Sequence, residues 1–264
     1  MLLRNVYTKT LWDQRRALLG WTVGITAVAA MYASFYPQLA GGSMAGFVAD
    51  FPQGLKDAFQ LNDLTSAAGY LGSSIFGLLV PLLTLGYGVA TGSRAIAGDE
   101  ESGKLEVLLT HPVGRAPFFL QRFAALVCGA LAIAVVLFLG MLAIRGAAQL
   151  DTVSVEGFAA QCLNLALFGS VFGALAGALG GAFGNRSLAL GVTAGVGVLA
   201  YAANTFAGQL GADWLRNLSP FYYYSGGEPL RNGMQWADAG ILVLIAAALV
   251  AAGTLAFTKR DLNT

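Results

Sequence analysis

Residues 158–183 read FAAQCLNLALFGSVFGALAGALGGAF, a stretch without Asp, Glu, Lys, Arg or His. A helix needs roughly 20 consecutive apolar residues to cross the hydrocarbon core of a bilayer, and this stretch is longer than that. Its apolar residues are continuous, whereas the strands of a transmembrane β-barrel alternate apolar and polar residues. The stretch therefore predicts a membrane-spanning helix.

Further runs of the same kind lie on both sides of this stretch. The chain is 56% hydrophobic and 11% charged, whereas a soluble domain carries about 25% charged residues. Only helices and closed barrels satisfy all backbone polar groups inside lipid, so we predict an all-α integral membrane protein with six transmembrane helices. The six runs are residues 18–36, 70–91, 123–144, 158–183, 188–207 and 239–257.

The distribution of basic residues predicts the orientation of the spans. With the N-terminus inside, the outer segments hold Lys56, Arg145, Arg216 and Arg231, and the inner segments hold the other 11 of the 15 Lys and Arg residues. Cytoplasmic loops carry such an excess, so both termini are predicted to be cytoplasmic and the protein to lie in the cytoplasmic (inner) membrane. The net charge of +1 gives no indication of a nucleic-acid partner.

We expect residues 1–264 to form a single transmembrane domain. Residues 1–17 place apolar side chains on one half of a helical wheel, as an amphipathic helix at the membrane interface does; a plain topology anchor fits as well. The outer loops are residues 37–69 and 208–238. The second loop is rich in aromatic residues, which favour the interface and could also contact a substrate; its central residues are Pro220, Phe221, Tyr222, Tyr223 and Tyr224.

Glycines recur every fourth residue through the fourth span, at Gly169, Gly173, Gly177 and Gly181. Such spacing leaves one helix face without side chains, so that another helix can approach closely. Weaker copies are Gly88 with Gly92 and Gly191 with Gly195. We favour packing within the chain, and an interface between subunits stays open as the alternative.

The chemistry of the spans excludes several classes of function. Proton relays and ion-coupled transporters place ionisable residues inside the membrane, and the spans hold almost none. Residues 98–105, GDEESGKL, approach a phosphate-binding loop. That motif needs a preceding strand and a Ser or Thr after the Lys, but here a membrane helix precedes it and Leu105 follows Lys104. We therefore expect neither enzyme activity nor a bound cofactor or metal in this chain.

The charged segment 93–122 separates the second and third spans. Ser102 and Gly103 are expected to end the helix that continues from the second span. Leu105, Leu108 and Leu109 then recur at helical spacing. Apolar side chains flanked by charge fit a groove on a partner protein, although a helix that rests on lipid would show the same pattern.

The run GDEESGKLEVLLTHPVGR, residues 98–115, closely resembles the first cytoplasmic loop of type-2 (exporter-like) ABC transporter permeases. Those proteins show a Gly-Glu-x-Glu-x-Gly-Thr-Leu-Glu-x-Leu-Leu-x-x-Pro-Val-x-Arg pattern, from which this chain departs with Asp99 and Lys104. The string LSPFYYYSGGEPLRNG, residues 218–233, is similar to a segment before the last span in one branch of the family. The similarity covers essentially the whole chain.

The resemblance implies a membrane subunit of an ABC exporter, paired with a second permease copy as a homodimer or heterodimer. Two copies of a separate ATPase subunit would carry ATP and Mg, and the loop would be the coupling helix that docks in a groove of that ATPase. Leu105, Leu108 and Leu109 would be the docking side chains, and residues 220–224 would help to close the outer end of the pathway. The remaining coupling positions are Asp99, Glu100, Glu101, Glu106, Pro112 and Arg115.

A second class of function stays open, in which the chain is a membrane scaffold that delivers mechanical work for the assembly or maturation of another complex. The scarcity of charge in the spans favours lipid-like, peptide or other amphipathic cargo over inorganic ions. The sequence does not assign the substrate further.

Overall fold

The computed structural model describes residues 5–38, 66–105, 114–209 and 211–260, and no strand occurs among them. Six helical stretches in these ranges are long and apolar enough to cross a membrane, which confirms the all-α fold with six spans. The elements are α1 (Val6–Ala33), α2 (Tyr36–Gln38), α5 (Ala67–Tyr70), η3 (Leu71–Leu79), α6 (Val80–Ser93), η4 (Arg94–Gly98), α7 (Asp99–Glu101), α9 (Arg115–Ile144), α10 (Val155–Phe183), α11 (Arg186–Phe206), η5 (Asp213–Leu218), α12 (Pro220–Ser225), α13 (Pro229–Asn232) and α14 (Trp236–Lys259).

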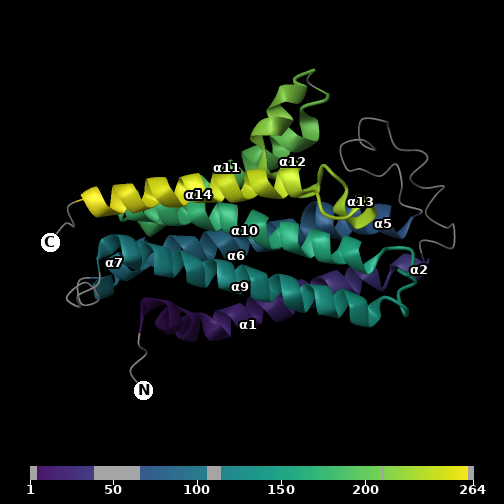
Figure 1. The fold of residues 1–264 in the computed structure, drawn as a ribbon, viewed down its shortest axis with the longest axis horizontal. Coiled ribbons are helices and arrows are strands. Elements are labelled where there is room, and N and C mark those ends of the chain that lie inside the picture. The colour runs from purple at the N-terminus through teal and green to yellow at the C-terminus, as the bar shows by residue number, and fades with distance from the viewer. Residues whose placement is uncertain (1–4, 39–65, 106–113, 210, 261–264) are drawn as a thin grey trace.

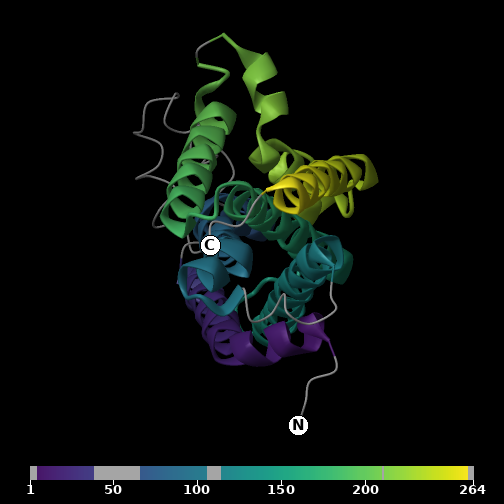
Figure 2. The same cartoon turned by 90° about the vertical axis from the view of Figure 1, so that its left-hand side faces the viewer.

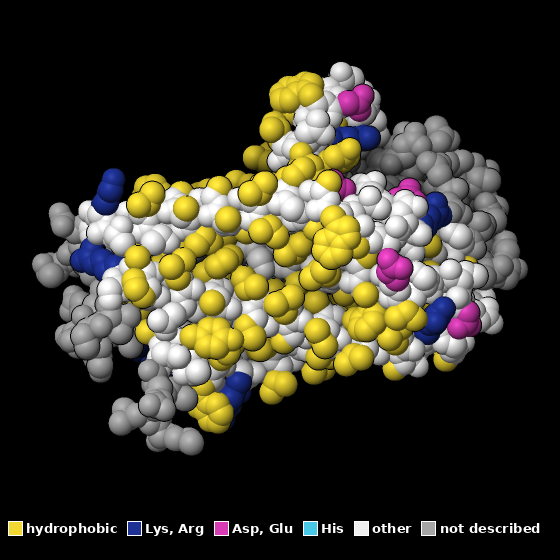
Figure 3. Space-filling view, viewed as in Figure 1, with side chains coloured by type: hydrophobic (Ala, Val, Ile, Leu, Met, Phe, Trp, Pro, Cys, Tyr) yellow, Lys and Arg dark blue, Asp and Glu magenta, His cyan; other side chains and the backbone are white. Residues whose placement is uncertain are grey.

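Most of the long helices run along one common direction, and the start of α1 and the end of α14 lie at the same end of the bundle (Figure 1). We call this end, which also carries α7, the inner end. On the face shown in Figure 3, hydrophobic side chains cover the middle of the molecule and charged side chains gather mostly toward the two ends. This is the surface that a bundle needs when lipid surrounds its middle.

Helix α10 is the central element of the bundle. It contacts α6, α9, α11 and α14, and most of its apolar stretch is buried inside the chain. The side chain of Ser154 caps its start by accepting a hydrogen bond from the backbone N of Gly157, 2.9 Å away. The helix ends at Gly184, whose φ of +66° is the left-handed conformation that a glycine adopts most easily.

The predicted interfacial helix and the first span form one continuous helix in the structure. Helix α1 begins after the cap residue Asn5, whose side chain accepts from the backbone N of Thr8, and runs unbroken to Ala33. No proline or turn-forming pair stands at residue 17, so the helical hydrogen bonds continue through this position. The end-on view in Figure 2 shows the first turns of α1 lying across the inner end of the bundle.

The second span continues beyond its apolar run. After α6 the chain forms the π-helical turn η4 and then α7, and it leaves the helix at Ser102 and Gly103 (φ +67°). The predicted helix end at Ser102 and Gly103 is thus confirmed. Of the outer loops, residues 39–65 lie outside the described residues, and the loop 208–238 contains η5, α12 and α13.

Candidate functional site

Three consecutive carboxylates, Asp99, Glu100 and Glu101, form α7 at the inner end. Arg122 of α9 donates a hydrogen bond to Asp99 and forms an ion pair with it. Arg260, the residue that follows α14, makes the same kind of contact with Glu100. Consecutive side chains of a helix point in different directions, so two neighbouring carboxylates reach two different spans.

Glu101 contacts a third span. Its Oε1 accepts a hydrogen bond from the backbone N of Arg186, the first residue of α11, at 2.8 Å. A carboxylate is stabilised there because the first N–H groups of a helix have no partner within the helix. We call this set the inner-end clamp: Asp99, Glu100, Glu101, Arg122, Arg260 and the backbone N–H of Arg186.

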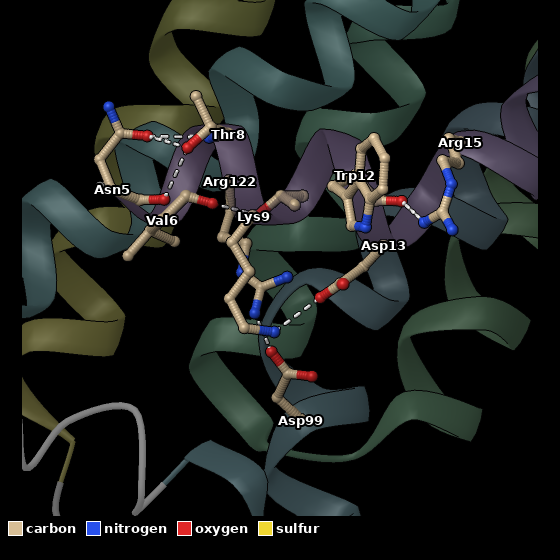
Figure 4. Close-up of polar contacts among 10 residues, drawn as sticks. Asn5, Val6, Thr8, Lys9, Trp12, Asp13, Arg15, Asp99 and Arg122 are labelled. Atoms are coloured by element: carbon tan, nitrogen blue, oxygen red, sulfur yellow. Dashed lines mark hydrogen bonds and ion pairs between the residues drawn. The ribbon is translucent and has the colours of Figure 1, made fainter. Parts of the chain in front are cut away.

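The two ion pairs of the inner-end clamp are shielded from solvent. The side chains are 10% and 20% exposed in the Arg122–Asp99 pair and 18% and 23% exposed in the Arg260–Glu100 pair. In the Lys9–Asp13 pair on α1 the corresponding values are 47% and 52%. Figure 4 draws the Arg122–Asp99 contact together with these first turns of α1. Removing one partner of a shielded pair leaves the other charge poorly solvated, which costs more than breaking an exposed pair.

Arg115 fastens the other side of the loop to the same span. It is the first residue of α9, and its Nη1 donates to the backbone O of Arg260 at 2.5 Å and to that of Phe257 at 3.5 Å. The last carbonyls of a helix have no partner within the helix, so an arginine at this place caps α14. Glu100 before the loop and Arg115 after it therefore both hold Arg260.

The loop itself lies mostly outside the described residues. Glu106, Leu108, Leu109 and Pro112 belong to residues 106–113, so their predicted roles stay predictions. Leu105 is described, and its side chain is 2% exposed.

Leu105 follows the turn at Gly103 and packs in a cluster with Phe118, Phe119 and Phe257. Its side chain is thus part of the chain's own core, and in this conformation it offers no surface to a partner. The apolar spacing that predicted a docking residue is equally the spacing of a residue that packs beneath its own spans.

A comparison with protein families matches almost the whole chain. Residues 3–258 match the family described as the C-terminal domain of the multidrug efflux system permease Rv1217c. The chain belongs to this family. It is thus a transport-related, multi-pass membrane subunit, as predicted at that coarser level. A search of curated proteins found no match.

The predicted glycine stripe of this permease packs against helices of the same chain. Helix α6 crosses α10 so closely that a Cβ added to Gly88 would lie 2.5 Å from the backbone O of Gly169. A Cβ on Gly173 would meet Leu126 of α9 at 2.6 Å, and one on Gly181 would lie 3.4 Å from the Cβ of Phe257. Gly177 is buried in the same face of α10. The stripe thus brings α6, α9 and α14 close to α10.

The predicted outer aromatic residues of the permease fall into two groups. Phe221 and Tyr224 of α12 are buried, and both rings pack on Phe168 of α10, with centroid distances of 4.7 and 5.1 Å. Burial raises the pKa of Tyr224 well above its ordinary value. Pro220, Tyr222 and Tyr223 are only half-buried, and the Tyr223 hydroxyl donates to the backbone O of Asn217 at 2.8 Å. This segment lies well away from α7 and the inner-end clamp (Figure 1).

Among the described residues no group of three or more His, Cys, Asp or Glu side chains could hold a metal ion. The three carboxylates of α7 are engaged with three different helices, which spreads their charge over separate contacts. The arrangement is therefore suited to a mechanical role, in which α7 joins the inner ends of α9, α11 and α14.

Proposed function

We propose that this permease is the membrane subunit of an ATP-driven exporter, in which a separate ABC ATPase docks on residues 106–113. Two ATPase copies would carry ATP and Mg, and a second permease copy would complete the membrane part. Family membership supports transport, and the efflux named in the family description supports export. The similarity of residues 98–115 to the coupling loop of type-2 ABC permeases supports the ATPase partner.

The observation that carries the proposal is the double attachment of the loop to Arg260. Glu100 holds the Arg260 side chain and Arg115 holds its carbonyl, while Asp99 and Glu101 extend the attachment to α9 and α11. A displacement of residues 106–113 would therefore be passed to three spans at once. Rigid-body movement of packed helices is an established way to open and close a transport pathway.

The cargo is proposed to be amphipathic. The spans carry few ionisable side chains, and a charged inorganic ion would need such groups to replace its water. The family description names multidrug efflux, and drug-like molecules are held mainly by apolar and aromatic surfaces.

The ATPase partner is tested by replacing Leu108 and Leu109 together with Asp. We expect a co-expressed ABC ATPase to co-purify with the unchanged permease and to be lost from the double variant. Leu218→Asp is the matched control, because Leu218 is 70% exposed at the outer side of the chain. Retention of the ATPase by the loop variant would contradict the docking proposal.

A transport measurement separates an exporter from a scaffold. The complex is reconstituted in vesicles, and ATP-dependent movement of an amphipathic fluorescent dye is followed. We expect accumulation that requires ATP. ATP hydrolysis without movement of several unrelated amphipathic dyes would favour the scaffold.

A further inference from the structure

An open pocket of about 40 Å³ lies between α1 and α6 toward the inner end of the bundle. Its apolar wall includes Leu18 and Trp21 of α1 and Ala90 of α6. Its polar groups include Gln14 and Arg94. The inner-end clamp lies elsewhere, since none of its residues lines this pocket.

Arg94 differs from the arginines that hold the inner-end clamp and cap α14. Arg115, Arg122 and Arg260 donate to carbonyl or carboxylate oxygens. Arg94 is exposed, and within the described part of the chain it forms neither a hydrogen bond nor an ion pair. No Asp or Glu lines the pocket that it borders. A guanidinium in such a place favours an anionic ligand.

The depth of the pocket indicates where that ligand comes from. Leu18 and Trp21 begin the first apolar run, and Arg94 comes one turn after the second run ends at residue 91. The pocket thus spans the boundary between hydrocarbon and headgroups, where tryptophan is enriched. Basic pockets between spans on the cytoplasmic side bind lipid headgroups, and arginine binds a phosphate through two parallel hydrogen bonds.

We propose that this α1–α6 pocket binds an anionic phospholipid of the inner leaflet. Arg94 and the Gln14 amide donate to the phosphate, and an acyl chain lies against Leu18, Trp21 and Ala90. A positively charged drug-like molecule would be repelled by Arg94, which argues against cargo as the occupant. The lipid would join α1 and α6 to Arg94, the first residue of η4, and η4 leads into the inner-end clamp. The binding site does not depend on the proposed ATPase.

Trp21 lines the pocket and serves as the reporter. The three other tryptophans, Trp12, Trp214 and Trp236, are 57%, 64% and 75% exposed, so their replacement by Phe leaves the core intact. The resulting full-length permease is reconstituted in vesicles of brominated phospholipid, which quenches tryptophan on contact. We expect brominated phosphatidylglycerol to quench Trp21 with about fivefold higher apparent affinity than phosphatidylcholine with the same chains, the effect of roughly one basic residue at a membrane surface.

The variants decide whether Arg94 is responsible. Arg94→Gln should abolish the preference for the anionic lipid, and Arg94→Lys should keep most of it. Arg16→Gln is the matched control, because Arg16 is an exposed arginine of α1 that does not line the pocket; it should keep the preference. Equal quenching by both lipids, or a preference that survives Arg94→Gln, would overturn the proposal. So would relief of quenching by excess inorganic phosphate, which would assign the pocket to a soluble anion.

Discussion

Arg115 donates a hydrogen bond to the carbonyl oxygen of Arg260, 145 positions further along the chain, at 2.5 Å. The guanidinium of the same Arg260 pairs with Glu100. The two arms of the loop therefore meet on one residue at the end of the last span. A loop held in this way can neither tilt nor slide without moving α14.

The Glu100–Arg260 pair should contribute measurably to stability. We expect a double-mutant cycle of Glu100→Gln and Arg260→Gln to give a coupling energy of about 1–2 kcal/mol, as found for contacting residues. The measurement is the free energy of unfolding in mixed micelles. The exposed Lys9–Asp13 pair, one helical turn apart at 2.7 Å, is the control and should give about 0.3–0.5 kcal/mol. Equal coupling energies for the two pairs would contradict the role assigned to shielding.

The same variant tests transmission of movement. Glu100→Gln should leave the proposed ATPase bound, since residues 106–113 are unchanged, and it should lower the dye moved per ATP hydrolysed. The ratio of transport to hydrolysis in vesicles is the measurement. If transport and ATP hydrolysis fall by the same factor, Glu100 acts on ATPase binding and not on coupling.

Asp99→Asn should destabilise the permease more strongly than Glu100→Gln. Arg122 is 9% exposed, so the variant leaves a buried charge without its partner, at a cost of about 3 kcal/mol. Asp99→Glu keeps the charge and should recover most of the stability. Replacing Arg122 by Met in the Asn variant removes the unpaired charge and should also recover stability. An Asp99→Asn variant as stable as the parent would show that solvent reaches Arg122.

Gly88→Ala should weaken the contact between α6 and α10. The added Cβ would lie 2.5 Å from the backbone O of Gly169, and a backbone atom cannot move aside as a side chain can, so we expect a loss of about 1–3 kcal/mol. Gly191→Ala is the matched control, because nothing lies within 4 Å of its Cβ position. Alanine is the better helix former by roughly 1 kcal/mol, so the control should be neutral or stabilising. The same unfolding assay measures both.

The sequence predicted the number and class of the spans because the thickness of the bilayer sets the length of each apolar run. Hydropathy alone did not predict where the second helix ends; the turn-forming pair Ser102 and Gly103 did. Hydropathy falls after residue 91, but the helical hydrogen bonds continue through η4 and α7 to Glu101. Charged residues favour water over lipid around a helix, but they do not by themselves end the helix.

The sequence around α7 did not predict which residues would pair with its carboxylates. A local pattern shows that Asp99 and Glu100 are charged, whereas their partners lie 23 and 160 positions away. Two arginines offered a signal for these partners. Arg122 lies at the inner end of the third span and Arg260 follows the sixth, and each stands next to an apolar run with little charge. Leu105 shows the same limit, because helical spacing marks an apolar face without telling which surface covers it.

Phe221→Ala should destabilise the outer part of the permease. The Phe221 ring is 2% exposed and packs edge-on against Phe168, and truncating a buried phenylalanine costs about 3–5 kcal/mol. Tyr222→Ala, at a half-buried neighbour, should cost clearly less. The free energy of unfolding measures both. If Phe221→Ala instead changes only transport, with stability intact, the segment acts on the pathway without supporting the fold.

Leu105→Ala should lower stability even when no ATPase is present. The side chain is 2% exposed among Phe118, Phe119 and Phe257, and removing a buried leucine side chain costs about 2–5 kcal/mol. The permease is purified alone, and its unfolding is compared with that of Leu108→Ala, which the docking proposal expects to be close to the parent. A Leu105→Ala variant that is fully stable alone and loses only the ATPase would place Leu105 on the docking surface in the assembled complex. Its burial would then belong to the unpartnered permease, and ATPase binding would have to pull residue 105 out of the cluster.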